Sequence, residues 1–245
     1  MAVGYTESLL MRMVRQNPPM KSAPSALAPS LVDQAYDTIR RRILDNAYPP
    51  GARALEGELA ADLGISRTPV REALIRLQNE SLIEIIPRHG MRVLPVSATD
   101  MKEIYEVITA LESCAVELVA RRKPATSEIE RLVDATRKMT SALEAKDFEA
   151  WALADEFFHR HLIEACGNRL LVEAIQQYRD RVHRALMFSV RFRPKLETSA
   201  KEHMVLVEKL RVGDVAGAVD THRAHRERAS RELLDIFERY KFQQL

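Results

Sequence analysis

The fold is constrained most strongly by one segment, "LGISRTPVREALIRL", at residues 63–77. Gly64 suits a left-handed turn, and Ser66 is a natural N-cap for a helix that follows it. Pro69 falls in the first turn of that helix, where its missing N–H costs nothing. Apolar residues then recur at helical spacing, with arginines between them. The segment predicts a turn followed by an amphipathic helix that ends near Glu80.

The flanking sequence extends this pattern into a small domain. Apolar spacing predicts a helix from Leu31, which the Pro-Pro-Gly turn at residues 49–51 stops, and a short helix follows the turn. After the central helix, residues 82–96 carry β-branched apolar residues on both sides of a turn with a glycine at its tip. Helix, helix, turn, helix and hairpin is the order of a winged helix-turn-helix, which we place at residues 31–96.

A second, almost entirely helical region follows. Ser97 fits a capping box, because an acid follows it by three residues. Turn residues divide the rest into predicted helices near residues 98–122, 127–144, 147–166, 168–191, 195–212 and 214–241. We therefore expect a mostly α protein, in which the winged helix-turn-helix precedes an all-α bundle of six to seven helices at residues 97–245. Residues 1–30 are expected to form a flexible tail, because their second half is rich in Pro, Ser and Ala.

Composition and charge exclude several classes of protein. No apolar run approaches the ~20 residues of a membrane span, and the N-terminus has no clean signal-peptide core. Cys114 and Cys166 lie far apart and form neither a CxxC metal motif nor a disulfide framework, which favours a cytoplasmic location. The net charge is only +2, and residues 31–95 contain nine Lys or Arg and nine Asp or Glu. Nucleic-acid binding must therefore depend on a few placed side chains.

The start of the central helix carries such side chains. Arg67 and Arg71 lie one helical turn apart and share a face, so both can reach base edges in a major groove. Ser66 and Thr68 supply hydroxyls and N–H groups at the positive end of the helix, which suits phosphate. The hairpin tip at His89–Gly90, with arginines beside it, is placed to reach an adjacent minor groove. Taken alone, the segment is better interpreted as a solvated arginine face on an ordinary helix.

The complete string, from the Pro-Pro-Gly turn to the glycine-tipped hairpin, resembles the GntR family of bacterial transcription regulators. The shared pattern is PPG, an E-x-E-L-A helix, LG-S-R-T-P-V-R-E-A-L and the hairpin, and it covers roughly residues 31–96. The resemblance implies DNA-contacting positions at Arg53, Arg67, Thr68, Pro69, Arg71 and Gly90. Two positions depart from the pattern, because Asn46 and Ser81 stand where the family usually has glycine.

Within the helical region, Asp155 and His159 are spaced to share one face of one helix. A carboxylate and an imidazole at this spacing can converge on one metal ion. Two more ligands would have to come from other helices, and the candidates are His203, His222 and His225. From spacing alone, a surface ion pair with isolated histidines is the commoner arrangement.

The same residues resemble the all-helical FCD effector domain of the FadR subfamily of GntR regulators, over roughly residues 100–240. The shared features are the D-x-x-F-H-x-x-L pattern that begins at Asp155, a later E-H pair, and a G-D pair that a histidine follows after twelve residues. The resemblance implies metal ligands at Asp155, His159, His203 and His225. Such oxygen and nitrogen donors suit Zn, Ni or Mn. It also implies a homodimer that binds a palindromic DNA operator, with repression as the commoner outcome, and a small organic acid as the effector.

One position of the effector pocket departs from the FCD pattern. The family usually carries an arginine where Ile108 stands, and that arginine would pair with an anionic effector. Arg181 is our candidate for supplying the charge instead. Arg179 and Arg184 are alternatives on the same predicted helix, and a less acidic effector would need none of them.

Two other functions compete with a ligand-responsive regulator. The four metal-ligand candidates would also suit a metal-dependent hydrolase that carries a DNA-binding appendage. No acid occupies an obvious general-base position, since Glu156 and Glu202 are displaced from the ligand faces, so we expect no enzyme. Alternatively, the helical region binds no metal and serves only for dimerisation.

Overall fold

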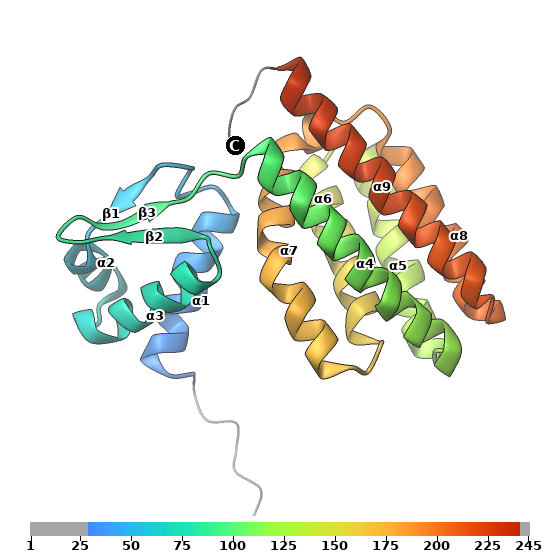
Figure 1. The fold of residues 1–245 in the computed structure, drawn as a ribbon, viewed down its shortest axis with the longest axis horizontal. Coiled ribbons are helices and arrows are strands. Elements are labelled where there is room, and N and C mark those ends of the chain that lie inside the picture. Colours follow the sequence, from blue (N-terminus) through green and yellow to red (C-terminus); the bar gives the residue numbers. More distant parts are fainter. Residues whose placement is uncertain (1–28, 241–245) are drawn as a thin grey trace, which may run out of the picture. The chain divides into compact units, whose positions relative to one another are not determined.

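The N-terminal part of the described chain is a winged helix-turn-helix (Figure 1). The structure, a computed structural model, describes residues 29–240, so the predicted tail lies almost wholly outside it. The elements of this domain are α1 (Leu31–Leu44), β1 (Arg53–Ala54), α2 (Glu56–Leu63), α3 (Arg67–Asn79), β2 (Ile83–Ile86) and β3 (Gly90–Val93). The predicted order of helices and hairpin is therefore confirmed.

The winged domain has one apolar core that α1, α2, α3 and the sheet share. In α1 the buried residues are Ala35, Ile39 and Ile43, each four positions after the last, as one helix face requires. In α3 the buried face consists of Pro69, Val70, Ala73, Leu74 and Leu77. The arginines between them therefore lie on the solvent side of α3.

The hairpin is part of a three-stranded antiparallel sheet, in the order β1-β3-β2. Arg53 pairs with Arg92 and Ala54 pairs with Met91, so β1 covers the edge of the wing. The sequence pattern did not predict β1, because two residues are too few to show an alternation.

Both positions where the family pattern has glycine adopt the left-handed conformation. Asn46 has φ 59° and Ser81 has φ 57°, at the ends of α1 and α3. Asparagine tolerates this region well and serine does so at some cost, so the turns keep their geometry without glycine.

Gly90 is required by both its conformation and its surroundings. Its φ is +73°, and a Cβ atom at this position would lie 2.1 Å from the carbonyl oxygen of Ala54. The close approach of β1 to β3 therefore leaves no room for a side chain.

The second domain is all α, as predicted. It comprises α4 (Ala98–Arg122), α5 (Thr126–Glu144), α6 (Phe148–Glu164), α7 (Arg169–Ser189), the short 3₁₀ helix η2 (Val190–Phe192), α8 (Leu196–Val212) and α9 (Val215–Arg239). Figure 1 shows α4 between α7 and α9, and it contacts both. Within residues 29–240, no helix combines the length and the apolar character needed to span a bilayer.

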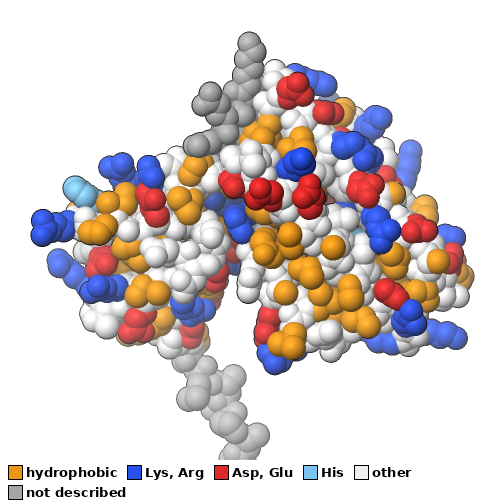
Figure 2. Space-filling model, viewed as in Figure 1, with side chains coloured by type: hydrophobic (Ala, Val, Ile, Leu, Met, Phe, Trp, Pro, Cys, Tyr) orange, Lys and Arg blue, Asp and Glu red, His pale blue; other side chains and the backbone are white. Residues whose placement is uncertain are grey.

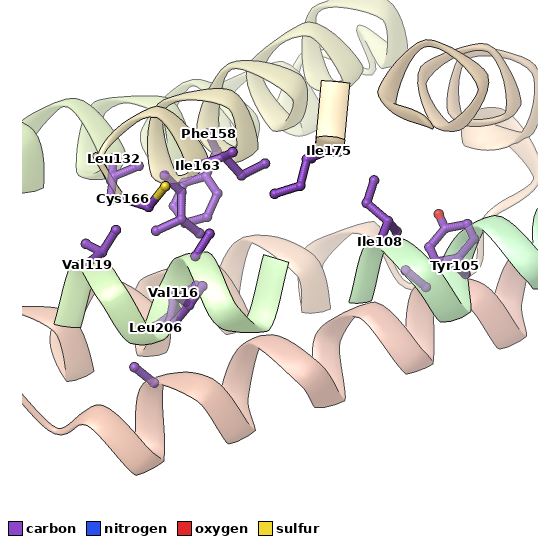
Figure 3. Packing of buried hydrophobic residues seen from close by; sticks show 14 of the residues in the cluster. Tyr105, Ile108, Val116, Val119, Leu132, Phe158, Ile163, Cys166, Ile175 and Leu206 are labelled. Carbon is purple, nitrogen blue, oxygen red and sulfur yellow. The ribbon is translucent and has the colours of Figure 1, made fainter. Parts of the chain in front are cut away.

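Side-chain caps begin four of these helices at the predicted breaks. Ser97 accepts a hydrogen bond from the backbone N–H of Asp100 at 3.0 Å, which confirms the capping box. Asp147, Asn168 and Asp214 cap α6, α7 and α9 in the same way. The amphipathic faces between the caps form a large apolar cluster around α4, and Figure 3 shows part of it.

We predict that Gly90→Ala destabilises the winged domain, because the new Cβ collides with β1 and also opposes a positive φ. Backbone strain alone costs roughly 1–3 kcal/mol, and the collision adds to it. Gly51→Ala is the matched control, since Gly51 has φ +80° but a Cβ atom added there would meet nothing within 4 Å. Amide hydrogen exchange of β3 measures the difference. Equal protection losses in the two variants would contradict the steric account.

Candidate DNA-binding and metal-binding sites

The predicted DNA-contacting side chains lie on the outside of the winged domain, with one exception. The exposed ones are Arg53, Ser66, Arg67, Thr68, Arg71 and His89. Gly90 is partly buried beside β1. The exception is Pro69, which is buried and packs in the first turn of α3. Pro69 therefore serves to begin helix α3, and its buried ring is not exposed for contact with DNA.

Ion pairing separates the arginines of the winged domain into two groups. Arg42 pairs with Asp62, Arg76 with Asp33, and Arg92 with Glu84. No ion pair to another described residue is formed by Arg53, Arg67, Arg71 and Arg88. Figure 2 shows Lys and Arg side chains along the outer edge of this domain. The winged domain has no net charge, yet its recognition helix, β1 and wing carry arginines without an acidic partner among the described residues, and these can bind phosphates or bases.

The guanidinium of Arg67 lies close to α2 at Gly57. A Cβ atom on Gly57 would lie 3.1 Å from Nη2 of Arg67. A side chain at position 57 would therefore displace the end of the Arg67 side chain by a few tenths of an ångström. The sequence pattern contained this glycine but gave no sign of its contact.

The four predicted metal ligands converge inside the helical domain. Asp155 and His159 come from α6, His203 from α8 and His225 from α9. Nε2 of His203 lies 3.3 Å from Nε2 of His225. Oδ1 of Asp155 lies 3.9 Å from Nε2 of both His159 and His203. Ligand atoms of the three histidines all lie within 4.8 Å of one another.

This donor set fits a divalent metal ion. Two nitrogen ligands at ~2.0–2.1 Å from a tetrahedral ion are separated by about 3.3 Å, which is close to the separation of His203 and His225. His159 is 1% exposed, and neither of its ring nitrogens has a hydrogen-bond partner. Buried polar atoms normally have partners, and a metal ion bound to one of these nitrogens would supply one.

Surrounding side chains orient two of these imidazoles. Nδ1 of His225 donates to a carboxylate oxygen of Glu202 at 2.7 Å, and Arg228 holds that carboxylate from the other side. Because a carboxylate only accepts, the hydrogen of His225 lies on Nδ1 and the lone pair lies on Nε2. The ring of His203 stacks on Phe158 at 3.9 Å between centroids.

Burial keeps the three imidazoles neutral. It lowers the pKa of His159 and His203 well below their ordinary range, and neighbouring Arg226 and histidines lower it further. Burial also lowers the pKa of His225 to about 4, although Glu202 opposes the shift. At neutral pH their lone pairs are therefore available to a metal. Burial raises the pKa of Asp155 to about 6, so this carboxyl gains from a nearby cation.

A buried ionic network adjoins this site, and sequence reasoning missed it. Glu112 on α4 is 0% exposed and accepts from Arg226 at 2.7 Å and from Nε2 of His222 at 3.0 Å. Arg179 is 3.4 Å from the same carboxylate. Burial alone would raise the pKa of Glu112, but Arg226, His222 and Arg179 hold it well below its usual range. Because His222 donates through Nε2 to Glu112, its role differs from that of His225.

The two predicted effector-pocket residues are not brought together. Ile108 is 0% exposed and points into the apolar cluster beside Tyr105 and toward Ile175 (Figure 3). Arg181 lines a shallow groove between α4 and α7, with its guanidinium 5.6 Å from the ring of Tyr178. The structure therefore separates Arg181 from the metal ligands.

The alternatives to Arg181 lie in two different places. Arg184 donates to the backbone carbonyl of Leu94 at 3.0 Å. Arg179 belongs to the Glu112 network. Arg226 and Arg193 line one small cavity with Asp155 and His225, and Nη2 of Arg228 lies 3.5 Å from Nδ1 of His225. Neither of the two cavity arginines belongs to the motif, so spacing could not reveal them.

We predict that Glu112→Gln costs about 3–5 kcal/mol of unfolding free energy, because Arg226 is left buried without its counter-charge. Glu117→Gln is the control on the same helix, since its ion pair with Arg121 is exposed and worth about 0–1 kcal/mol. Urea unfolding followed by the fluorescence of Trp151, the single tryptophan of the chain, measures both losses. Similar losses in the two variants would show that the network contributes little.

Comparisons with known proteins agree with this architecture. Residues 31–93 match the gntR family of bacterial regulatory proteins, and residues 103–228 match the FCD domain. An uncharacterized HTH-type transcriptional regulator of Agrobacterium vitis, from the TAR-I ttuE-ttuC' intergenic region, is 46% identical over 138 residues, which cover 56% of this chain and 80% of that protein. The probable D-xylose utilization operon transcriptional repressor of Paenarthrobacter nicotinovorans is 31% identical over 185 residues, which cover 76% of this chain and 80% of that protein.

Two solved structures share the fold. E. coli McbR/YncC has a TM-score of 0.75 at 24% identity and covers 86% of this chain and 100% of its own. A putative GntR regulator from Rhodococcus sp. RHA1 has a TM-score of 0.71 at 21% identity and covers 84% of this chain and 99% of its own. With the winged helix-turn-helix, the helical domain and the two family matches, the chain belongs to the GntR family of DNA-binding transcription regulators and carries an FCD effector domain.

Proposed function

We propose that this regulator is a repressor that binds a palindromic operator as a homodimer and senses a small organic acid at a metal site in its FCD domain. The observation that carries the proposal is the convergence of one carboxylate and three neutral imidazoles from three helices at one buried point. The relative named as a repressor supports the direction of regulation.

Operator recognition depends on the arginines that no acid neutralises. Arg67 and Arg71 begin the recognition helix, where a guanidinium binds O6 and N7 of guanine in the major groove. Ser66 and Thr68 lie at the N-terminal end of the same helix and suit a phosphate. Arg53 on β1 and His89 in the wing extend the contact to the neighbouring backbone and minor groove.

A stripe of apolar side chains on α4 supports the homodimer. Val107 is 40% exposed, Cys114 is exposed, and Leu111 and Leu118 are partly buried. Their spacing of four, three and four residues follows the repeat by which helices pair. Figure 2 shows hydrophobic side chains on the face of the helical domain along which α4 runs. A twofold pair of subunits matches a palindromic operator.

The metal site provides the effector response. Asp155, His159, His203 and His225 would hold a zinc, nickel or manganese ion and leave positions open for a further ligand. When bound, the ion supplies Lewis acidity that attracts a carboxylate oxygen. Effector binding changes operator affinity only to the extent that the effector prefers one of the two states of the regulator.

We predict that the purified protein holds one divalent metal per chain, and that His159→Ala and His203→Ala each lose it. His161→Ala is the matched control, because His161 lies off the ligand face of α6 and bonds to the backbone oxygen of Phe157. Elemental analysis by mass spectrometry measures the stoichiometry. Metal retained in both ligand variants, or absent from folded wild-type protein, would refute the site and favour a purely structural FCD domain.

We predict that Arg71→Ala lowers the preference for the operator by about 5- to 150-fold, since a bidentate base contact is worth ~1–3 kcal/mol. Arg76→Ala removes the same charge from the same helix, but Arg76 is already paired with Asp33. Fluorescence anisotropy with the upstream region of the regulator's own gene, against scrambled DNA, gives both ratios. An Arg71→Ala protein that discriminates like wild type would remove Arg71 from the base-reading set.

A further inference from the structure

A small cavity adjoins the proposed metal ligands inside the FCD domain. Asp155 and His225 form one side of it, and Trp151, Arg193 and Arg226 line it with apolar side chains of α4, α7 and α9. Its volume of about 20 Å³ admits roughly one water-sized group. The cavity is thus bordered by metal ligands, by two cations and by an indole.

Two hydrogen-bond donors at this cavity have no partner among the described residues. They are Nε1 of Trp151, on a side chain that is 1% exposed, and Nη2 of Arg193. Arg193 uses its Nε to reach Oγ of Ser189 at 3.3 Å. Arg226 differs, because both sides of its guanidinium bind Glu112. Unpaired buried donors are costly, so an acceptor is expected here.

We propose that Arg193 and Trp151 bind the carboxylate of the effector beside the metal ligands, an inference that rests on the proposed function. A carboxylate offers two acceptor oxygens and a negative charge, which match a guanidinium N–H and an indole N–H. Arg193 thereby supplies the positive charge that Ile108 does not.

Among the residues that line the cavity, Arg193 differs in its place in the fold. Arg193 lies between η2 and α8, whereas every other residue of the cavity wall lies within an α-helix. Because the cavity admits only about one water-sized group, an acid can enter only if a side chain of its wall shifts. The proposal assigns this shift to Arg193, since its side chain can move without the displacement of a helix.

The test uses the fluorescence of Trp151, because it is the single tryptophan of the chain and lines this cavity. Metal-saturated, full-length protein is titrated with acetate and succinate, and in parallel with acetamide and succinamide. The acids are expected to change the fluorescence and the amides are not. Arg193→Gln should weaken acid binding ~10-fold or more, as expected for loss of a charge-assisted hydrogen bond, and Arg193→Lys by less.

Arg191→Gln is the matched control, since Arg191 is an exposed arginine on η2 that does not line the cavity. It should bind the acids like wild type, and all variants should keep the metal. Equal affinity in wild type and Arg193→Gln, equal affinity for acids and amides, or no response to either acid would overturn the inference and leave a cavity for water only. The metal content of the same samples is also measured. Wild-type protein that binds no metal after incubation with it would overturn the proposed metal site, and this inference with it.

Discussion

The structure of the FCD domain depends on how it accommodates a polar centre inside an apolar helical bundle. His159 and His203 are each 1% exposed, and Asp155 lies between them. Burial of such groups is unfavourable unless each finds a partner. The protein supplies partners to only some of these atoms: His225 has Glu202, whereas both nitrogens of His159 have none. The proposed metal ion would reduce this imbalance, because it would bind one lone pair of each imidazole and compensate the carboxylate charge.

The ionic network around Glu112 places a permanent charge pair next to this centre. Arg226 follows His225 directly in α9, so the helix that contributes a metal ligand also contributes the counter-charge for α4. The ion pair between Glu112 and Arg226 therefore helps to fix the position of His225, which precedes Arg226 in α9. In the winged domain the arrangement is reversed, since acids pair with four arginines, namely Arg40, Arg42, Arg76 and Arg92, while Arg67 and Arg71 form no ion pair with a described residue. The charged side chains of the helical domain are thus buried beside the proposed metal site, whereas the unpaired arginines of the winged domain are exposed on its DNA-binding surface.

The helices and the wing could be predicted from the sequence, since they follow local periodicity, caps and turn residues. The ligand set was predicted only from the resemblance to the FCD pattern, because spacing alone favoured a surface ion pair and isolated histidines. The short strand at Arg53–Ala54 could not be predicted, because only its pairing with β3 defines it. Arg193 and Arg226 were missed for a similar reason: their roles arise from tertiary contacts between helices distant in sequence. Sequence alone offered no physical ground for choosing among Arg179, Arg181 and Arg184, and the structure places the guanidinium of Arg181 5.6 Å from the ring of Tyr178.

The most direct measurement of the central claim is X-ray absorption fine structure at the edge of the metal held by the full-length protein. The account predicts a first shell of nitrogen and oxygen at about 2.0–2.2 Å, with the multiple-scattering pattern of three imidazoles. Loss of one imidazole contribution in His225→Ala would assign the α9 ligand. A shell without imidazole scattering, or one containing sulfur, would contradict the account, because it would place the metal away from Asp155, His159, His203 and His225.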